Sequence, residues 1–120
     1  MSYNVRLSDN FKREAKRLIK KYRSLKVELA ELMEELEENP KQGILITTDI
    51  YKIRMAVKSK GRGKSGGVRI LTFINEDKQK ILLFSIFDKS EKDNLSQKQI
   101  ADLVKDFKWE DDEDNKSEEE

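Results

Sequence analysis

The sequence YKIRMAVKSKGRGKSGGVRILTFIN, from Tyr51 to Asn75, predicts two β-strands joined by a glycine-rich loop. In the first strand, apolar side chains alternate with Lys52 and Arg54, which is typical of a strand with one buried face. The loop combines several glycines with a run of basic residues, so its backbone can turn while its side chains stay charged. We therefore expect an antiparallel hairpin with a basic loop at its tip.

The register of this hairpin follows from its apolar pattern. A shift by one residue would mix apolar and charged side chains on both faces, so the pattern favours one alignment. That alignment pairs Val57 with Gly66, Met55 with Val68, Ile53 with Ile70, and Tyr51 with Thr72. It also places Arg54 opposite Arg69, with Lys52 on the same face, and facing like charges destabilise a strand pair. We therefore expect the cluster either to bind a phosphate or to pair with an acid such as Asp88 or Glu91.

The glycine loop does not match the phosphate loops of nucleotide-binding enzymes. A Walker loop needs a glycine five positions before Gly63, and that position is Lys58. The G-x-G-x-x-G pattern at residues 61–66 matches a dinucleotide fingerprint, but that fingerprint opens a helix and a strand follows here. The segment is therefore interpreted as a hairpin loop, either a basic contact surface or a mobile surface loop.

The remaining sequence predicts three helices and two further strands. Residues 3–7 form a short strand, Ser8 caps a helix, and a second helix covers residues 25–36 and ends at Asn39-Pro40. The run KILLFSIF at residues 80–87 is apolar on both faces and predicts an interior strand. Ser96 and Gln99 form a capping box that opens a C-terminal helix. The order β-α-α-β-β-β-α predicts an α+β fold with a small, largely antiparallel twisted sheet, one face covered by a helical hairpin and the other open.

Composition excludes several classes of enzyme. The 120 residues include no cysteine and no histidine, which excludes thiolate or histidine metal sites and Ser-His or Cys-His nucleophiles. We therefore expect neither a metal nor an organic cofactor. No apolar run approaches the roughly 20 residues of a membrane span, and the N-terminal residues lack a signal peptide pattern. These features predict a cytoplasmic protein without a membrane partner.

Charge is distributed unevenly along the chain. The net charge is +1, from 25 basic and 24 acidic residues, but residues 110–120 hold eight of the acids and one of the lysines. Residues 1–109 therefore carry a net charge of about +8, which favours a polyanionic partner such as nucleic acid. The acidic block has no apolar residue to anchor it. We expect one domain over residues 1–109 and a disordered tail over residues 110–120.

Three separated segments give this sequence a resemblance to a known family. They are YKIRMA at 51–56, GRGKSGGVRI at 61–70 and FDKSEKDNLSQKQI at 87–100. Together with the predicted element order, they resemble the RelE/ParE toxin superfamily, closest to its HigB-like branch, over about residues 5–107. The resemblance implies a RelE-like fold and a toxin of a bacterial type II toxin–antitoxin system. It also implies a ribosome-dependent endonuclease that cuts mRNA in the ribosomal A site and inhibits translation.

The resemblance implies partners and site residues as well. The partners are mRNA and a cognate antitoxin protein, expected to be of the helix-turn-helix type, with DNA contacted only through the antitoxin complex. The matching catalytic positions are Lys52, Arg54, Arg69 and Lys89. Lys92 is a further match and an expected RNA contact. The residues themselves add the basic loop side chains Lys58, Arg62 and Lys64 and the ring of Phe73, which shares a face with Arg69 and offers a surface on which a base can stack.

These residue types suit RNA cleavage without histidine or metal. Arg54 and Arg69 can hold the scissile phosphate, Lys52 among other cations is a candidate base, and Lys89 is a candidate for protonating the leaving group. One position departs from the family, because RelE has a tyrosine near the start of its last helical segment where this sequence has Leu95. Two alternatives therefore stay open: a non-enzymatic ParE-like toxin that binds gyrase, and a basic RNA-binding domain without catalysis.

Overall fold

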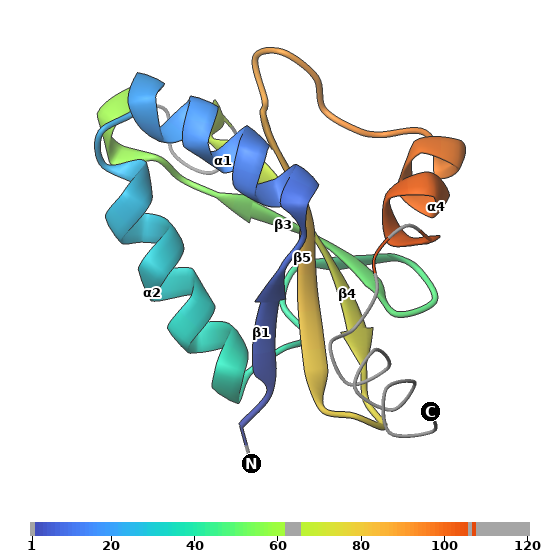
Figure 1. Cartoon of the computed structure of the whole chain (residues 1–120). Coiled ribbons are helices and arrows are strands. Elements are labelled where there is room, and N and C mark those ends of the chain that lie inside the picture. The colour runs from blue at the N-terminus through green and yellow to red at the C-terminus, as the bar shows by residue number, and fades with distance from the viewer. Residues whose placement is uncertain (1, 62–65, 106, 108–120) are drawn as a thin grey trace, which may run out of the picture.

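The computed structural model describes residues 2–61, 66–105 and 107 (Figure 1). Its elements in chain order are β1 (Asn4–Leu7), α1 (Asp9–Lys21), α2 (Leu25–Glu38), β2 (Ile44–Thr47), β3 (Ile50–Met55), the 3-10 helix η1 (Lys58–Lys60), β4 (Val68–Asn75), β5 (Lys80–Asp88) and α4 (Gln97–Lys105). The strands form one sheet in the order β1-β5-β4-β3-β2. β1 is parallel to β5, and every other neighbouring pair is antiparallel. The predicted α+β class and the interior position of β5 are confirmed.

The predicted helical hairpin is present, and its ends are determined by local sequence. The backbone N–H of Phe11 donates to the Ser8 side chain at 3.0 Å, which caps the first turn of α1. Residues 22–24 alone separate α1 from α2, and α2 ends at Asn39, directly before Pro40. The two helices bury one apolar stripe each against the sheet: Phe11, Ala15, Leu18, Leu25, Leu29, Leu32 and Leu36. This layer is the larger of the two cores.

The hairpin register between β3 and β4 is the one that the apolar pattern predicts. Met55 pairs with Val68, Arg54 with Arg69, Ile53 with Ile70, and Tyr51 with Thr72. Gly67 explains why the two chain segments can approach so closely at the loop end of the hairpin, since a Cβ at this position would lie 1.9 Å from the carbonyl oxygen of Met55. The register therefore depends on the apolar pattern along the strands and on Gly67, which has no side chain to block the close approach to Met55.

One strand was not expected from the sequence. β2 pairs with β3 at the edge of the sheet, so the sheet has five strands rather than the four predicted. The strand has the sequence ILIT, and Ile44, Leu45 and Ile46 are exposed. Its first three residues are all apolar, so no two-residue alternation marks the segment as a strand before the pairing with β3 is known.

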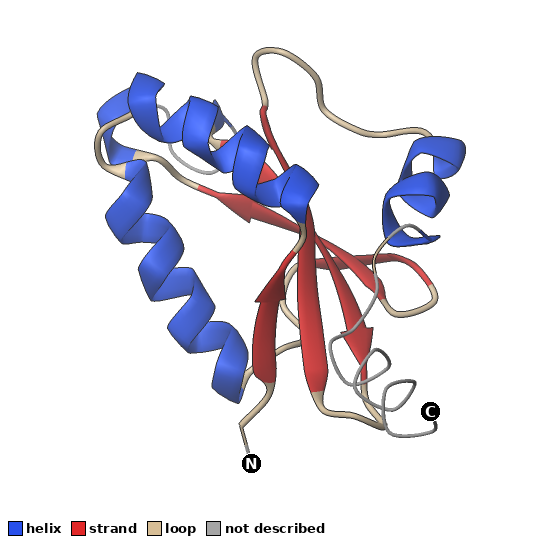
Figure 2. Cartoon of the chain, in the orientation of Figure 1, coloured by secondary structure: helices blue, strands red, loops and turns tan. Residues whose placement is uncertain are grey.

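The sequence predicts that the second face of the sheet is open, but in the structure this face is partly covered. α4 packs on it, and the side chains of Ile50, Leu71, Leu82, Phe84, Phe87 and Ile100 form a second buried cluster. Figure 2 shows the strands lying between the α1–α2 pair on one side and α4 on the other. The predicted capping box holds the start of α4, because the Ser96 backbone N–H donates to Gln99 at 2.8 Å and the Gln99 N–H donates to Ser96 at 3.1 Å. The sheet is therefore covered on both faces over part of its area.

Candidate functional site

The predicted basic cluster lies on the sheet face opposite α1 and α2. Ile53 of β3 packs into the core beneath the helices, so its neighbours Lys52 and Arg54 point to the other face. Arg69 of β4 is paired directly with Arg54, which places the Cβ atoms of the two residues about 5 Å apart. The segment 89–96, which connects β5 to α4, supplies the remaining groups of the cluster.

Asp93 joins two of the predicted catalytic residues. Its Oδ1 lies 3.5 Å from Nε of Arg69 and 3.9 Å from Nζ of Lys89. The Arg69 side chain is only 2% exposed, whereas Asp93 is 53% exposed and Lys89 is 38% exposed. A half-exposed carboxylate oxygen thus lies between a buried guanidinium and a half-exposed ammonium, which is the position that an anionic ligand oxygen would take.

Lys52 is also contacted by this segment. Its Nζ donates to Oδ1 of Asn94 at 3.1 Å, and the residue is buried. Arg54 is exposed on the same face. The structure therefore brings together Lys52, Arg54, Arg69 and Lys89, and it places Asp93 and Asn94 over the two buried members. Sequence reasoning did not identify Asp93 or Asn94, although the spacing of four residues between Lys89 and Asp93 is a signal for such an ion pair.

The two acids that sequence analysis considered as partners for the arginines have other contacts. Glu91 forms an ion pair with Arg17 of α1 at 2.8 Å. Asp88 is fully buried, and it accepts hydrogen bonds from Lys60 at 2.6 Å and from the hydroxyl of Tyr22 at 2.5 Å. Pairing of a cluster arginine with an acid is thus observed, but the acid is Asp93.

Asp88 organises the end of the site that carries Lys89. Burial would by itself raise the pKa of this carboxyl group, but hydrogen bonds from Lys60, Tyr22 and Ser90 outweigh burial and hold the pKa well below its ordinary range. Lys60 also donates to the Gly67 carbonyl at 3.3 Å, and the backbone N–H of Lys89 donates to the same carbonyl at 3.1 Å. One buried carboxylate therefore connects α1, the glycine loop and the turn after β5.

The other predicted RNA contacts are dispersed. Lys58 is exposed in η1, where its backbone N–H donates to Glu28 of α2. Phe73 lies four residues after Arg69 on β4, which is about 13 Å along the strand, so the two side chains are not neighbours. Its ring packs against the buried cluster under α4. Lys92 lies nearer to the cluster, because its Nζ is 5.5 Å from the centre of the ring of Phe87, and Phe87 pairs with Arg69 across β4 and β5. Arg62 and Lys64 lie outside the described residues, as does the predicted tail at 110–120.

Leu95 takes the position for which the resemblance implies a tyrosine, and it packs against the α4 cluster. No group of three or more potential metal-binding acids occurs in the part of the chain that the structure describes. Within the same residues, no helix is long and apolar enough to cross a bilayer. The groups that the sheet face and the adjoining segment offer are two guanidiniums, from Arg54 and Arg69, and two ammoniums, from Lys52 and Lys89, which suit electrostatic stabilisation of an anion.

Comparison with known proteins agrees with the fold. A family model described as the RelE toxin of the RelE/RelB toxin–antitoxin system matches residues 8–112. The isolated E. coli RelE toxin is similar in structure, with a TM-score of 0.57 and 16% identity over 88% of this chain and 100% of that chain. An E. coli RelE variant bound to an antitoxin peptide gives 0.57 and 17% over 90% and 100% of the two chains. The toxin–antitoxin complex RelBE2 from Mycobacterium tuberculosis gives 0.52 and 14% over 73% and 99%. At these identities the structural likeness shows the fold, and the family model, which covers most of the sequence, shows that the chain belongs to the RelE family of toxins from toxin–antitoxin systems.

Proposed function

We propose that this chain is a ribosome-dependent endonuclease that cuts mRNA in the A site and so inhibits translation in the bacterial cytoplasm. The observation that carries the proposal is the convergence of Arg69 and Lys89 on a single carboxylate oxygen of Asp93, on the face that also holds Lys52 and Arg54. Such an arrangement binds an anionic oxygen between fixed cations, which is what a scissile phosphate requires.

Each residue has a role in the proposed reaction. The 2′-oxygen of the RNA attacks phosphorus, the bond from phosphorus to the 5′-oxygen breaks, and negative charge accumulates on the phosphoryl oxygens. Arg54 and Arg69 would stabilise that charge, Lys52 would take the proton from the 2′-hydroxyl, and Lys89 would supply a proton to the 5′-oxygen. No step uses a metal ion.

Substrate binding requires the connecting segment to give way. Arg69 and Lys52 are buried beneath Asp93 and Asn94, so a phosphate must displace the Asp93 carboxylate before it contacts Arg69. Asp93 is half exposed, and an ion pair with such an acid contributes little free energy. A phosphate that forms two hydrogen bonds with the guanidinium of Arg69 can therefore replace it. The exposed Arg54 and the half-exposed Lys89 would make the first contacts.

An antitoxin is the protein partner that this function requires. Solved structures of family members include RelE bound to an antitoxin peptide and the RelBE2 toxin–antitoxin complex. By the same reasoning, we propose that a small antitoxin, of the helix-turn-helix type, neutralises this chain. Contact with DNA would then occur only through the antitoxin.

Primer extension on mRNA in a translating extract tests the proposal. Arg69→Ala should lower cleavage by roughly 100-fold or more, because the guanidinium stabilises charge that develops in the transition state. Arg69→Lys should restore little, since a point charge cannot replace a planar fork. Arg54→Ala provides a second test, because this exposed side chain can be removed with little effect on folding.

Arg23→Ala is the matched control. Arg23 is exposed between α1 and α2, away from the cluster, so its removal should leave cleavage unchanged. Circular dichroism would confirm that each variant is folded. If the wild-type chain produces no cleavage and instead inhibits supercoiling by gyrase, the proposed function is wrong and the non-enzymatic alternative replaces it.

A further inference from the structure

Residues 110–120 are the most acidic part of the sequence, and the proposed reaction does not use them. They include eight acids and one lysine, whereas residues 1–109 carry a net charge of about +8. Five of the acids are consecutive, from Glu110 to Asp114. In an extended chain they place one negative charge about every 3.5 Å, which is close to the one phosphate per ~3.4 Å along a strand of nucleic acid. The acidic segment therefore resembles a nucleic acid strand in its charge density.

The described chain ends on the sheet face that carries the basic cluster. The basic cluster consists of Lys52, Arg54, Arg69 and Lys89. The last described residue, Phe107, follows α4 and packs against the buried apolar cluster under that helix. Two members of this apolar cluster adjoin the basic cluster, because Leu71 is paired with Lys52 and Phe87 is paired with Arg69. The acidic segment therefore begins three residues after a side chain that packs beside the basic cluster.

The acidic segment is long enough to lie across the basic cluster. The residues that follow Phe107 are 108–120, and a fully extended chain of that length spans about 45 Å. Glu110, the first acid, lies at most about 11 Å from Phe107. A ligand tethered by so short a connection has an effective concentration in the millimolar range. Weak charge pairs are therefore sufficient to keep such a ligand on the surface.

The basic cluster and the segment beside it have cations at the surface. Arg54 is exposed, and the Lys89 side chain is 38% exposed. Lys92 lies in the same connecting segment as Lys89 and is exposed as well. Neither Arg54 nor Lys92 forms an ion pair within the part of the chain that the structure describes. Carboxylates can therefore reach these side chains without displacing another acid from Arg54 or Lys92.

We propose that residues 110–120 bind Arg54, Lys89 and Lys92 of the same chain and compete there with RNA phosphates. The opposite charges of the two surfaces support the contact. Because its charges are exposed, the contact is weak and is screened by salt, so RNA at high local concentration displaces it. The competition with RNA rests on the proposed function, whereas the contact within the chain does not. The segment would reduce binding of RNA outside the ribosome and still yield to an mRNA that the ribosome presents.

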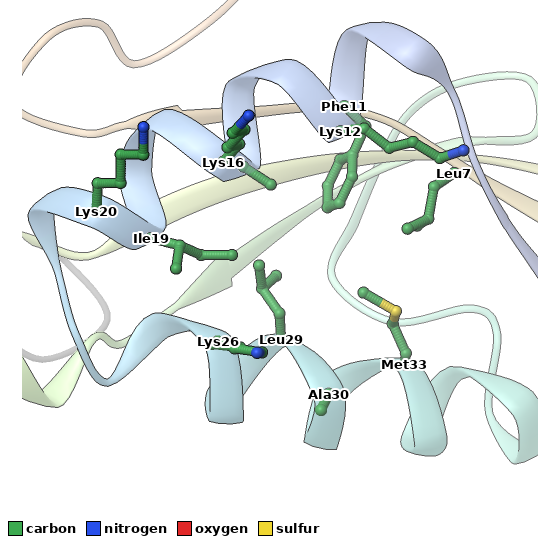
Figure 3. Close-up of a pocket in the computed structure, with 11 residues that line it drawn as sticks. Leu7, Phe11, Lys12, Lys16, Ile19, Lys20, Lys26, Leu29, Ala30 and Met33 are labelled. Atoms are coloured by element: carbon green, nitrogen blue, oxygen red, sulfur yellow. The ribbon is translucent and has the colours of Figure 1, made fainter.

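A second concentration of positive charge fits the acidic segment less well. It lies at the edge of a cavity of about 550 Å³ between α1 and α2, whose floor is apolar (Figure 3). The four lysines at this cavity are Lys12, Lys16, Lys20 and Lys26. Residues 110–120 include no apolar side chain that could fill the floor. The cavity also lies on the sheet face opposite Phe107, so the chain would have to pass around the edge of the sheet.

Nuclear magnetic resonance of the full-length chain tests the contact without RNA. The comparison variant keeps all 120 residues and replaces the eight acids of residues 110–120 by their amides, Glu→Gln and Asp→Asn. The backbone amide signals of Arg54, Lys89 and Lys92 should differ between the two proteins at about 0.05 M salt. The differences should disappear at about 1 M salt, where charges are screened beyond about 3 Å. Signals of Lys16 and Lys20 on α1 should coincide, and changes confined to α1 or absent from the basic cluster would overturn the proposal.

Fluorescence anisotropy tests the competition with a labelled single-stranded RNA that carries 2′-O-methyl groups, because RNA blocked at the 2′-oxygen cannot be cleaved. The amide variant should bind this RNA at least fivefold more tightly than the wild-type chain. The gain should persist when Lys16→Ala and Lys20→Ala are introduced into both proteins. It should fall below twofold when Arg54→Ala and Lys92→Ala are introduced instead. The two pairs are matched, since each removes two positive charges from exposed side chains.

The matched pairs separate a local contact from a general effect of net charge. An equal gain in both backgrounds would show that the acids act at long range, and it would overturn the proposal. A gain that disappears only with the α1 pair would place the acidic segment on α1 and would overturn the proposal as well. If neither full-length protein binds RNA, the proposed function is refuted, and the resonance comparison still decides whether residues 110–120 bind the basic cluster.

Discussion

Replacement of Asp88 by asparagine is expected to cost more stability than any other isosteric change in the acids that surround the site. The Asp88 carboxylate is fully buried and accepts hydrogen bonds from Lys60, Tyr22 and Ser90. Lys60 is itself only 7% exposed. Asparagine preserves the shape of the side chain but removes the charge, so the Lys60 ammonium would stay buried without its counter-ion.

The size of the effect follows from that geometry. Removing one partner of a buried ion pair typically costs about 3–5 kcal/mol, because the remaining charge is left uncompensated. Lys21 also lies 3.7 Å from Asp88 but is half exposed, so it can supply only part of the compensation. We therefore expect a loss of about 3 kcal/mol, which corresponds to a fall in the thermal midpoint of roughly 12 °C for a domain of this size.

The pH dependence provides an independent test. The pKa of Asp88 in the folded state lies well below its ordinary range, so its contribution to stability is complete above the unfolded pKa of about 4. The contribution is lost as pH falls from about 4 toward the folded pKa, because the unfolded chain takes up the proton first. The wild-type protein should therefore lose stability between pH 5 and pH 2, and the asparagine variant should lose less over the same range.

Urea unfolding followed by far-UV circular dichroism at pH 7 and at pH 3 measures both effects. Glu91→Gln is the control, because Glu91 forms an exposed ion pair with Arg17, and its loss should change the unfolding midpoint only slightly. The reasoning is refuted if Asp88→Asn and Glu91→Gln are equally mild at pH 7. Parallel pH dependences of wild type and Asp88→Asn would also refute it.

Two other changes test local features of the fold. Gly67→Ala should strongly destabilise the hairpin or force the strands apart, because its Cβ would lie 1.9 Å from the Met55 carbonyl oxygen, and thermal unfolding would show the loss. Ser96→Ala should lower the free energy of unfolding by about 1 kcal/mol, because it removes the side-chain oxygen that accepts the hydrogen bond from the Gln99 backbone N–H at the start of α4. Amide hydrogen exchange in α4 should become faster while exchange in β5 stays slow.

The candidate site depends on contacts between segments that are far apart in the chain. Lys52 and Arg54 come from β3, Arg69 from β4, and Lys89, Asp93 and Asn94 from the turn after β5. The pairing of β3 with β4 places three of these residues on one face, and its register follows from the alternation of apolar residues, with Gly67 allowing the close approach. The position of the turn does not, because it depends on the hydrogen bonds that Asp88 accepts from Tyr22, directly after α1, and from Lys60 of η1.

Sequence alone determined the features that arise from local period and local capping. Alternation identified β3 and β4 and their register, helical spacing together with Ser8 and Asn39 defined the α1–α2 hairpin, and the Ser96 box marked the start of α4. These interactions act over a few residues or along one hairpin, so the pattern itself carries the information.

Tertiary structure decided the features that arise between distant segments. It added β2, whose residues ILIT have no two-residue alternation of their own and form a strand only beside β3. It placed α4 over the second face, because the apolar side of that helix needs Leu71 and Phe84 to cover it. It also selected Asp93 rather than Asp88 or Glu91 as the acid at Arg69. The three acids are close in sequence and carry the same charge, so only the folded structure determines which of them contacts Arg69.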